Sequence, residues 1–379
     1  MTNGVKREGS QALVPSAGME ALGRAIFAKA GCSPEEADRI ARRLTGANLR
    51  GHDSHGVIRI PRYVQWIGDG VQVPNQTVTL LLDQPSFAIV DGRYGFGQSI
   101  GEQTVDIGIA RAKKRGVAVT ALRNSGHLGR IGDWAERAAA QNIVSIHMVN
   151  VRGSLLVAPY GSLSRRMGTS PFCAGIPVAG GEPIILDFAT SLVAEGKALV
   201  ALKGGKPLPH GSLVDGDGNL TADPSPLYGT VPPNGYPDAN NGPGALRAFG
   251  DHKGSGMNFL MEMMAGALGG SGTAGAIGEP KRRRFCNGMF SFYVDAAAFD
   301  TENAFAAEVK SYVDFVKSAT PTTPGGEVLV PGEKERATLA ERTAKGLPLA
   351  VEAWDDIQNT ARKLGIGEAD IEAAVGGPV

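Results

Sequence analysis

The chain has 379 residues, 42% of them hydrophobic and 20% charged, which is typical of a globular protein with room for two domains. Its 38 basic residues balance 38 acidic ones, so it lacks the positive charge expected of a nucleic-acid-binding protein. Three widely spaced cysteines, an N-terminus without an apolar signal sequence and the absence of any long uncharged apolar stretch predict a cytoplasmic protein that neither crosses nor binds a membrane.

The N-terminal region is predicted to be helical after a flexible tail over residues 1–15. Residues 18–31 place apolar side chains at helical spacing, and this pattern ends at Gly31. A second helix is expected to begin at Ser33, because serine is a favoured N-cap and Pro34 suits the first helical position. A further helix is expected through residues 62–70.

The pattern changes at about residue 86 to short runs rich in β-branched residues. Strands are expected within residues 86–92, 117–122 and 143–150, with helices at 98–115 and 130–141 between them. This alternation predicts an α/β layer with at least some parallel pairing. Residues 203–245 are rich in loops, residues 253–270 form an apolar helix, and the chain after about residue 300 is mostly helical.

Gly95, Gly97 and Gly101 imitate the glycine-rich loop of a dinucleotide-binding Rossmann fold. Such a loop follows its strand at once, and an acidic residue ends the next strand. Here four residues intervene, and the next strand ends in "VTALRNSG" without an acidic residue. We therefore expect a tight turn into a packed helix, with no Rossmann phosphate loop at this position.

The stretch "RGHDSHGVIRIPRY", residues 50–63, concentrates side chains that carry chemistry. His52, Asp53 and His55 could supply ligands to a catalytic metal, which leaves a metal-dependent hydrolase or lyase as an alternative. A nucleophilic serine is disfavoured, because neighbours in sequence rarely form a triad and no G-x-S-x-G turn occurs. The remaining interpretation is recognition of an anionic substrate.

If residues 54–63 are helical, His55, Arg59 and Tyr63 lie on one stripe. The planar guanidinium of Arg59 would then suit a carboxylate. This segment alone also permits an ordinary packed histidine and a surface ion pair. A second candidate, His127, lies between Gly126 and Gly129 after a predicted strand, where glycines let a ligand approach and a histidine can exchange protons near neutral pH.

Several stretches carry a resemblance to a known family and occur in this order: "ANLRGHDSHGVIRIPRY", "NSGHLGRIGDWAERAA", "VAPYGSLSRRMGTSPF", "ILDFATSLVAEGK", "HKGSGMNFLMEMMAGAL", "NGMFSFYVD" and "VPGEKERATLAERTAKGLPL". Over residues 20–350 the chain resembles the malate/L-lactate dehydrogenase family of the non-Rossmann type. Relatives in that family include sulfolactate, ureidoglycolate and diketogulonate dehydrogenases and piperideine-2-carboxylate reductases.

The resemblance implies a family-specific α/β fold with a mixed sheet that binds NADH or NADPH without the Rossmann loop, flanked by helical N- and C-terminal regions. It implies a homodimer in which residues 16–125 and 300–379 form a substrate and dimerisation domain and residues 126–299 form the nicotinamide-cofactor domain. The implied substrate is a small carboxylate, and no metal is implied.

The resemblance also assigns residues to roles. His127 resembles the catalytic acid and base, with His55 and Arg59 beside it, and Arg59 is placed on the substrate carboxylate. The substrate-binding residues implied are Ser54, His55, Arg59 and Tyr63. The cofactor contacts implied are Ser125, His127, Asp187, Phe188, Ala189, Lys253, Asn287, Gly288 and Met289.

The implied reaction moves a hydride between the nicotinamide and C2 of a 2-hydroxy or 2-oxo acid, and reduction of cyclic 2-imino acids is an alternative on the same site. The individual substrate and the choice between NAD and NADP stay open, although the basic run Lys281–Arg284, also readable as a solvated loop, favours NADP by charge. Ser170 stands where the family has asparagine, and Arg152 is unusual at its position, so binding details there are not carried over.

Overall fold

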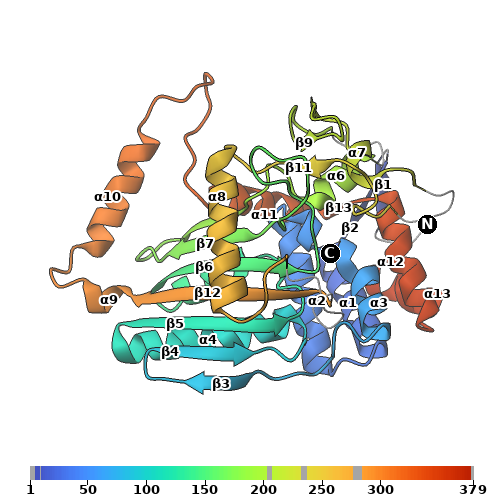
Figure 1. The fold of residues 1–379 in the computed structure, drawn as a ribbon. Helices are drawn as coiled ribbons and strands as arrows, with labels where there is room; N and C mark the ends of the chain where they lie inside the picture. The colour runs from blue at the N-terminus through green and yellow to red at the C-terminus, as the bar shows by residue number, and fades with distance from the viewer. Residues whose placement is uncertain (1–4, 9, 203–206, 232–236, 276–283, 377–379) are drawn as a thin grey trace.

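The computed structural model describes residues 5–8, 10–202, 207–231, 237–275 and 284–376, and Figure 1 labels its helices and strands. The strands are β1 (Lys6–Glu8), β2 (Gln11–Val14), β3 (Thr79–Asp83), β4 (Phe87–Asp91), β5 (Val117–Ser125), β6 (Ile143–Arg152), β7 (Pro171–Ile176), β8 (Ile184–Ala189), β9 (Leu213–Val214), β10 (Leu220–Thr221), β11 (Ala245–Leu246), β12 (Cys286–Asp295) and β13 (Leu347–Ala350).

The α-helices are α1 (Ser16–Lys29), α2 (Pro34–Leu49), α3 (Ile60–Gly68), α4 (Gly97–Arg115), α5 (Gly132–Ala139), α6 (Glu195–Leu202), α7 (Ser225–Tyr228), α8 (His252–Met261), α9 (Ala296–Phe299), α10 (Phe305–Lys317), α11 (Glu333–Lys345), α12 (Val351–Lys363) and α13 (Glu368–Val375). Two short 3₁₀ turns, η1 (Asp53–His55) and η2 (Val57–Arg59), precede α3, and a π-helical segment, η3 (Glu262–Leu268), continues α8.

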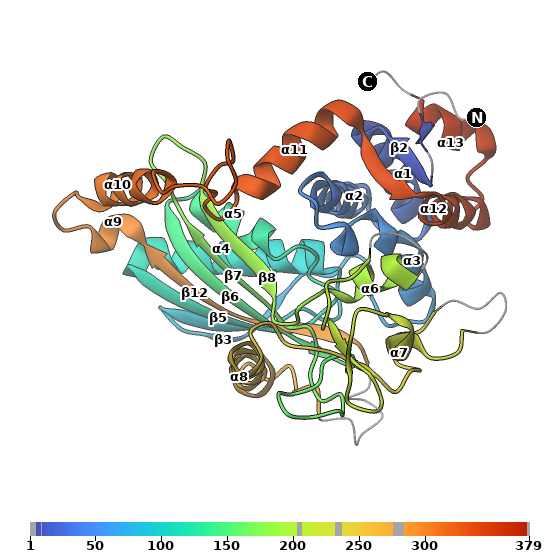
Figure 2. The same ribbon diagram turned by 90° about the horizontal axis from the view of Figure 1, so that it is seen from above.

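A seven-stranded sheet in the order β3-β4-β5-β12-β6-β7-β8 is the centre of the molecule. Only the β4–β5 pair in this sheet is parallel, so the sheet is mixed. Helices α4 and α5 cover one face, and α8 with η3 covers the other (Figures 1 and 2). The predicted α/β class, the strands near residues 86–92, 117–122 and 143–150, and the helices between them are confirmed.

The glycines that imitate a Rossmann loop serve close packing at the start of α4. An ideal Cβ on Gly97 would lie 2.1 Å from the carbonyl oxygen of His127, and one on Gly101 would lie 2.5 Å from the Trp134 ring. Neither position tolerates a side chain, because real Cβ atoms do not approach other atoms so closely. The expected turn into a packed helix is what the structure shows.

A second core joins the two ends of the chain. Helices α1, α2 and α3 pack with α12 and α13 around buried aliphatic and aromatic side chains. Ser33 caps α2 as predicted, since its Oγ accepts a hydrogen bond from the Glu36 N–H over 3.2 Å. Strand β2 pairs with β1 on one side and with β13 on the other.

The prediction of a flexible tail over residues 1–15 is wrong for the residues of β2. Ala12 and Val14 are fully buried, and β2 is held by β13, which lies near the other end of the chain. A strand of four residues has little periodicity of its own, so pairing with a distant segment decides its structure.

The domain boundary expected between residues 125 and 126 falls at the last residue of β5, inside the central sheet. Strand β12 pairs with both β5 and β6. Side chains of β4, β5, β6 and β12 share one hydrophobic core with those of α4 and α5. The structure therefore groups β3, β4 and β5 with the rest of the sheet and not with the N-terminal helices.

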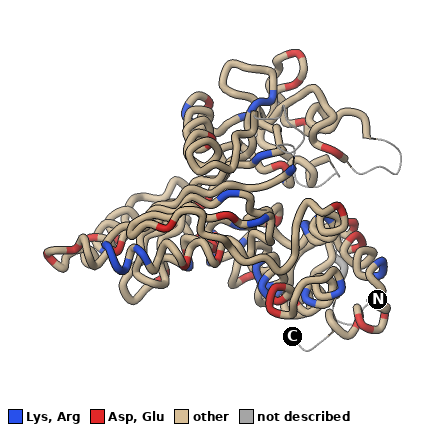
Figure 3. The backbone as a smooth tube through the Cα atoms, turned by 60° about the horizontal axis from the view of Figure 1, so that its bottom comes forward, with Lys and Arg blue, Asp and Glu red and all other residues tan. Residues whose placement is uncertain are grey.

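A third, smaller region covers residues 207–231 and 237–249, where the sequence predicts loops. It contains the short sheet β10-β9-β11 and a small core with side chains from α6 and α7. Basic and acidic residues are interspersed along the backbone (Figure 3), in keeping with the balanced charge. Among the described residues, no helix combines the length and the apolar character needed to cross a membrane.

Candidate active site

The segment 50–63 is not one continuous helix, so the predicted single stripe of His55, Arg59 and Tyr63 is wrong in its geometry. Gly56 is extended, with φ −96° and ψ −151°, and it separates η1 from η2. The side chain of Asn48 occupies this corner: its Oδ1 accepts from the Val57 N–H over 2.7 Å, and a Cβ on Gly56 would lie 1.9 Å from it. The chain therefore turns around Asn48 before α3 begins.

The turn still gathers the expected polar groups. The Arg59 Nε–H donates to the carbonyl oxygen of Ser54 over 2.6 Å, and the Ser54 Oγ lies 3.0 Å from His55 Nδ1. The Nη2 end of Arg59 is 4.0 Å from Glu195 Oε2 at the start of α6. The hydrogen bond to the Ser54 carbonyl thus fixes the orientation of the Arg59 guanidinium. Its Nη2 nitrogen has only a long contact with a carboxylate, that of Glu195.

A salt bridge anchors the front of the segment. Arg342 on α11 binds Asp53, with Nη2 3.1 Å from Oδ2, and the Asn48 side-chain amide donates to Asp53 Oδ1 over 2.7 Å. His52 lies between two other carboxylates, 4.0 Å from Asp187 and 3.8 Å from Glu335. Asp53 is therefore committed to structural contacts, and the described residues contain no group of three side chains able to hold a metal ion.

His127 meets this segment from the loop after β5. Its ring stacks on that of His55, with centroids 5.4 Å apart and planes within 11°. On its other side, His127 Nδ1 lies 2.6 Å from the hydroxyl of Tyr63. The loop is fixed from behind, because the Leu128 N–H donates to Asn287 Oδ1 over 3.0 Å and the start of α4 packs against the His127 carbonyl.

Burial and positive charge set the protonation of this pair. Burial, followed by the Arg59 guanidinium and His55, holds the pKa of His127 well below its usual range. Burial, followed by Arg59, His52 and Lys197, lowers the pKa of His55 to about 3. Both imidazoles are therefore neutral near pH 7, which is compatible with their stacking and leaves each ring one donor and one acceptor nitrogen.

Comparison with known proteins identifies the family at this point. The family model described as malate/L-lactate dehydrogenase matches residues 14–358. The chain belongs to the malate/L-lactate dehydrogenase family. Members of this family are oxidoreductases that depend on a pyridine nucleotide, so the protein is a dehydrogenase of that kind.

Three relatives illustrate the likeness. Hydroxycarboxylate dehydrogenase B of Escherichia coli O157:H7 is 35% identical over 92% of this chain and 94% of its own. The solved malate dehydrogenase of Pyrococcus horikoshii OT3 is 26% identical with a TM-score of 0.82, over 97% of this chain and 99% of that one. The solved delta1-piperideine-2-carboxylate reductase of Pseudomonas syringae pvar. tomato is 30% identical with a TM-score of 0.76, over 92% of this chain and 99% of that one.

In this dehydrogenase, several of the expected cofactor residues support the His127 loop and α5. Asp187 Oδ2 accepts from the Gly132 N–H at the first residue of α5 over 2.7 Å. The Asn287 side chain joins the Leu128 N–H to the Asn150 carbonyl oxygen. Burial raises the pKa of Asp187, and His52 and Arg130 offset part of that effect.

The remaining expected cofactor residues divide into two groups. Met289 is fully buried in the sheet core, and Gly288 packs against Asn150, where a Cβ would lie 2.5 Å from Oδ1. Both residues therefore have packing contacts within the sheet. Phe188 packs edge-on against Phe249; Ala189, with Phe188, ends strand β8, and Lys253 is exposed on the first turn of α8.

Ser125 differs from the other expected cofactor residues in the hydrogen bonding of its side chain. It is fully buried two residues before His127, and its Oγ has no hydrogen-bond partner within the described part of the chain. A buried hydroxyl without a partner carries an energetic cost, so such groups commonly await a ligand or an ordered water. The carboxamide of a nicotinamide has both a donor and an acceptor, and either would fit this hydroxyl.

Sequence reasoning missed three groups that complete the site. Gln98 Nε2 donates to the Tyr63 hydroxyl over 3.1 Å, the Phe285 ring lies 6.4 Å from the His127 ring, and Glu195 faces Arg59. Gln98 lies among the glycines that imitate a Rossmann loop, and no local signal separates it from an ordinary helical glutamine. Tyr63, expected to contact substrate, is fully buried, and its hydroxyl contacts His127 and Gln98.

The two departures from the family pattern have structural contacts. Arg152 is buried and donates from Nη1 to the Ser271 carbonyl oxygen over 2.8 Å and from Nη2 to the Tyr94 hydroxyl over 3.2 Å. Ser170 is fully buried in a left-handed conformation with φ +27°, and its carbonyl oxygen accepts a hydrogen bond from Thr190 Oγ1 over 2.8 Å. Of the basic run, residues 281–283 lie outside the described residues, and Arg284 stacks 3.6 Å above the Tyr94 ring.

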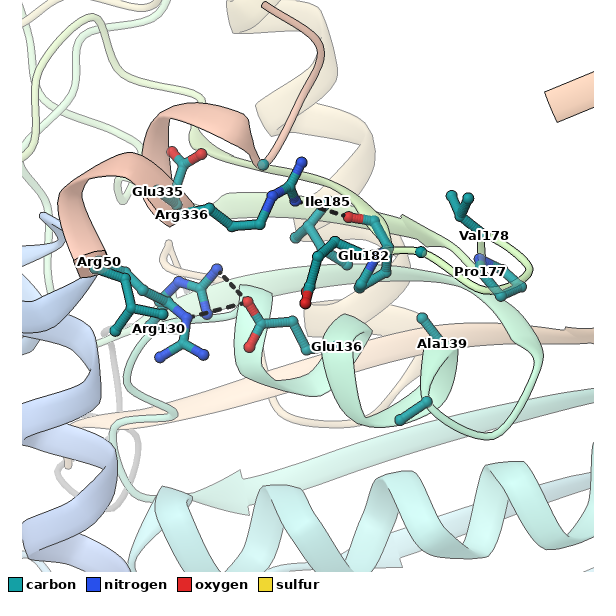
Figure 4. Close-up of a pocket in the computed structure, with 15 residues that line it drawn as sticks. Arg50, Arg130, Glu136, Ala139, Pro177, Val178, Glu182, Ile185, Glu335 and Arg336 are labelled. Carbon is teal, nitrogen blue, oxygen red and sulfur yellow. Dashed lines mark hydrogen bonds and ion pairs between the residues drawn. The ribbon is translucent and has the colours of Figure 1, made fainter. Parts of the chain in front are cut away.

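A pocket of about 380 Å³ lies between α5, the β7–β8 connection and the start of α11 (Figure 4). Its charged groups pair with one another: Glu136 Oε1 is 3.2 Å from Arg50 Nε and 2.9 Å from Arg130 Nη2. The pocket is lined by neither His55 nor His127. It therefore lies apart from the histidine pair, where the polar groups converge.

Proposed function

We propose that this dehydrogenase moves a hydride between NADH or NADPH and C2 of a 2-oxo or 2-hydroxy acid. The observation that carries the proposal is the convergence of two neutral, stacked histidines and one oriented arginine in a partly buried site. The relatives named hydroxycarboxylate, L-lactate and malate dehydrogenase act on acids of this class. The bound nicotinamide supplies or accepts the hydride, and the protein residues bind, orient and protonate the substrate.

Arg59 binds the substrate carboxylate in this proposal. Its Nε–H is already used by the Ser54 carbonyl, so the Nη nitrogens are the free donors, and a substrate carboxylate would replace the weak contact with Glu195 at 4.0 Å. A guanidinium held in one orientation gives a charge-assisted, geometrically specific contact with a carboxylate. Such positioning of the reacting carbon lowers the barrier by several kcal/mol.

His127 exchanges the proton at the substrate oxygen. A positioned acid or base of this type contributes about 10²-fold to 10⁴-fold in rate. His55 and Ser54 lie on the same side as Arg59 and support the carboxylate or the reacting oxygen by hydrogen bonds. The low pKa of both histidines means that a proton placed on either ring is readily given up.

Ser125 is the residue we place on the carboxamide of the nicotinamide, because its buried hydroxyl has no hydrogen-bond partner among the described residues. Phe188, Ala189 and Lys253 stay proposed contacts for the rest of the cofactor. Asp187 and Asn287 act through the backbone that they hold. Whether the cofactor is NADH or NADPH is a question for direct titration.

Reduction of a cyclic 2-imino acid is the second candidate on the same site. Support comes from the likeness to the piperideine-2-carboxylate reductase of Pseudomonas syringae pvar. tomato. The chemistry is equivalent, because C2 receives the hydride, the ring nitrogen takes the proton from His127, and Arg59 binds the same carboxylate. A screen that pairs pyruvate-like 2-oxo acids with cyclic imines of matched size separates the two.

We further propose that the enzyme is a homodimer. Large apolar side chains are exposed on α8, where Phe259 and Leu260 are 55% and 62% exposed, and on α10, where Tyr312 and Phe315 are 68% and 72% exposed. Helix α10 extends away from the body of the chain (Figures 1 and 2). Apolar surface of this kind marks an interface, and light scattering of the purified protein tests it.

Two variants and one titration test the proposed reaction. His127→Ala should lower kcat by about 10²-fold to 10⁴-fold, whereas Arg59→Ala should chiefly raise KM for the acid. Quenching of tryptophan fluorescence on titration with NADH and NADPH should show saturable binding that EDTA does not change. Full activity in both variants would overturn the assignment, and loss of cofactor binding in EDTA would favour the metal-dependent alternative.

A further inference from the structure

A fully buried tyrosine lies against the His127 ring. Tyr63 is fully buried, and its ring packs against Phe96 and Trp66, each with centroids 5.8 Å away. Its hydroxyl lies 2.6 Å from His127 Nδ1 and 3.1 Å from Gln98 Nε2. Gln98 is itself 1% exposed, so Gln98, Tyr63 and His127 form a buried chain of hydrogen-bonding groups.

The hydrogen-bond donors available in Gln98 and Tyr63 favour one position for the proton of the neutral His127 ring. The amide nitrogen of Gln98 can only donate, so the Tyr63 oxygen accepts there. The single hydroxyl hydrogen of Tyr63 is then available to His127 Nδ1 as its acceptor. A neutral imidazole has one N–H, and with Nδ1 as acceptor that N–H is on Nε2, the nitrogen that does not face Tyr63.

We propose that Tyr63, held by Gln98, is a positioning residue of the reaction: it keeps the His127 proton on Nε2 and refills Nδ1 as Nε2 gives that proton to the substrate. This inference rests on the proposed function. During reduction the hydride forms the new C–H bond at C2, and the carbonyl π pair becomes a lone pair on oxygen. That oxygen takes the Nε2 proton, Nδ1 takes the Tyr63 hydroxyl proton, and the negative charge ends on the Tyr63 oxygen. After the product leaves, Nε2 takes a proton from solvent and Nδ1 returns its proton to the Tyr63 oxygen.

The charged surroundings favour this route over one through a histidine cation. Arg59 on η2 and His55 on η1 face His127, and Lys197 on α6 faces His55. Each of these groups, when positive, disfavours an imidazolium, as does burial. The relay keeps the ring neutral throughout. Burial raises the pKa of Tyr63 to about 12 and so disfavours the transient negative charge on its oxygen, and the Gln98 N–H and the Arg59 guanidinium offset part of that effect.

Tyr63→Phe tests the inference, because it removes only the hydroxyl and keeps the buried ring. We expect kcat for reduction of a 2-oxo acid to fall by about 10²-fold, while the dissociation constant for NADH or NADPH changes less than twofold. The remaining activity should rise as the pH falls below 7, since an imidazolium must then supply the proton. The wild-type profile should be flat in the same range.

Tyr293→Phe is the matched control. Tyr293 is also fully buried, and its hydroxyl lies 3.3 Å from Thr120 Oγ1 within the sheet. This variant should keep the wild-type kcat and pH profile, which separates the loss of a buried hydroxyl in general from the loss of this one. Nitrogen NMR of ¹⁵N-histidine-labelled enzyme adds a readout independent of turnover: Nδ1 of His127 should be unprotonated in the wild type and partly protonated in Tyr63→Phe.

The outcomes distinguish the two proposals. If His127→Ala and Arg59→Ala both keep full activity, the proposed function fails whatever Tyr63→Phe does. If His127→Ala is inactive but Tyr63→Phe matches the wild type in kcat and pH profile, the relay alone is overturned. A wild-type His127 protonated at Nδ1 also overturns it. Loss of rate in Tyr63→Phe with the acid-dependent profile and the changed tautomer supports it.

Discussion

The contact between Gly97 and the His127 loop leads to a quantitative prediction for Gly97→Ala. The new Cβ would lie 2.1 Å from the His127 carbonyl oxygen and 2.6 Å from Leu128 Cα, whereas ordinary contact begins at 3.4 Å. The start of α4 and the loop must therefore move apart by about 1.3 Å. Overpacking of this kind costs about 1–3 kcal/mol in the free energy of unfolding.

The same displacement should reach the chemistry, because His127 is the residue whose backbone must move. A misplacement of about 1 Å in a reacting group lowers the rate by roughly 10²-fold, so kcat should fall by about that factor. The assay is the nicotinamide-linked reduction of a 2-oxo acid at saturating substrate, with urea unfolding measured on the same preparation.

Gly68→Ala is the control for this experiment. Gly68 ends α3, the helix that carries Tyr63, and a Cβ there would meet nothing within 4 Å. This variant should keep the wild-type kcat and be equally stable or more stable, by up to about 1 kcal/mol. If Gly97→Ala also shows wild-type kcat and stability, the start of α4 does not position His127, and the reasoning is refuted.

Two further predictions concern the surroundings of the site. Arg342→Met removes one partner of Asp53 and should lower kcat/KM by about 10-fold and the stability by about 1 kcal/mol. Lys345→Met on the same helix, which breaks an exposed pair with Glu341, should change both quantities much less; equal effects of the two variants would contradict the anchoring role. Burial lowers the pKa of His147 to about 3, while an unfolded histidine titrates near 6.5. The contribution of the neutral, buried His147 to the free energy of unfolding is therefore complete above pH 6.5 and is lost as the pH falls towards 3. His147→Gln should therefore reduce the dependence of the unfolding free energy on pH in that window by up to about 1.4 kcal/mol per pH unit, and unchanged dependence in urea titrations would show that His147 is protonated in the folded state.

The elements that depend on local periodicity could be predicted from the sequence. The strands β4, β5 and β6 and the helices α4 and α5 show their apolar spacing within a single window, and Ser33 and Pro34 mark the start of α2 through contacts a few residues away. The family resemblance, carried by motifs, likewise needs no tertiary information. It led to the correct family and to the gathering of Ser54, His55, Arg59 and His127.

The rest was decided by contacts between segments far apart in the chain. Strand β2 exists because β13 pairs with it, and the segment 50–63 turns at Gly56 because the Asn48 side chain fills the corner. Gln98 and Tyr63 become partners of His127 only when α3, α4 and the loop after β5 pack together. A hydrogen bond depends on distance and direction in space, and neither is written in the order of the residues.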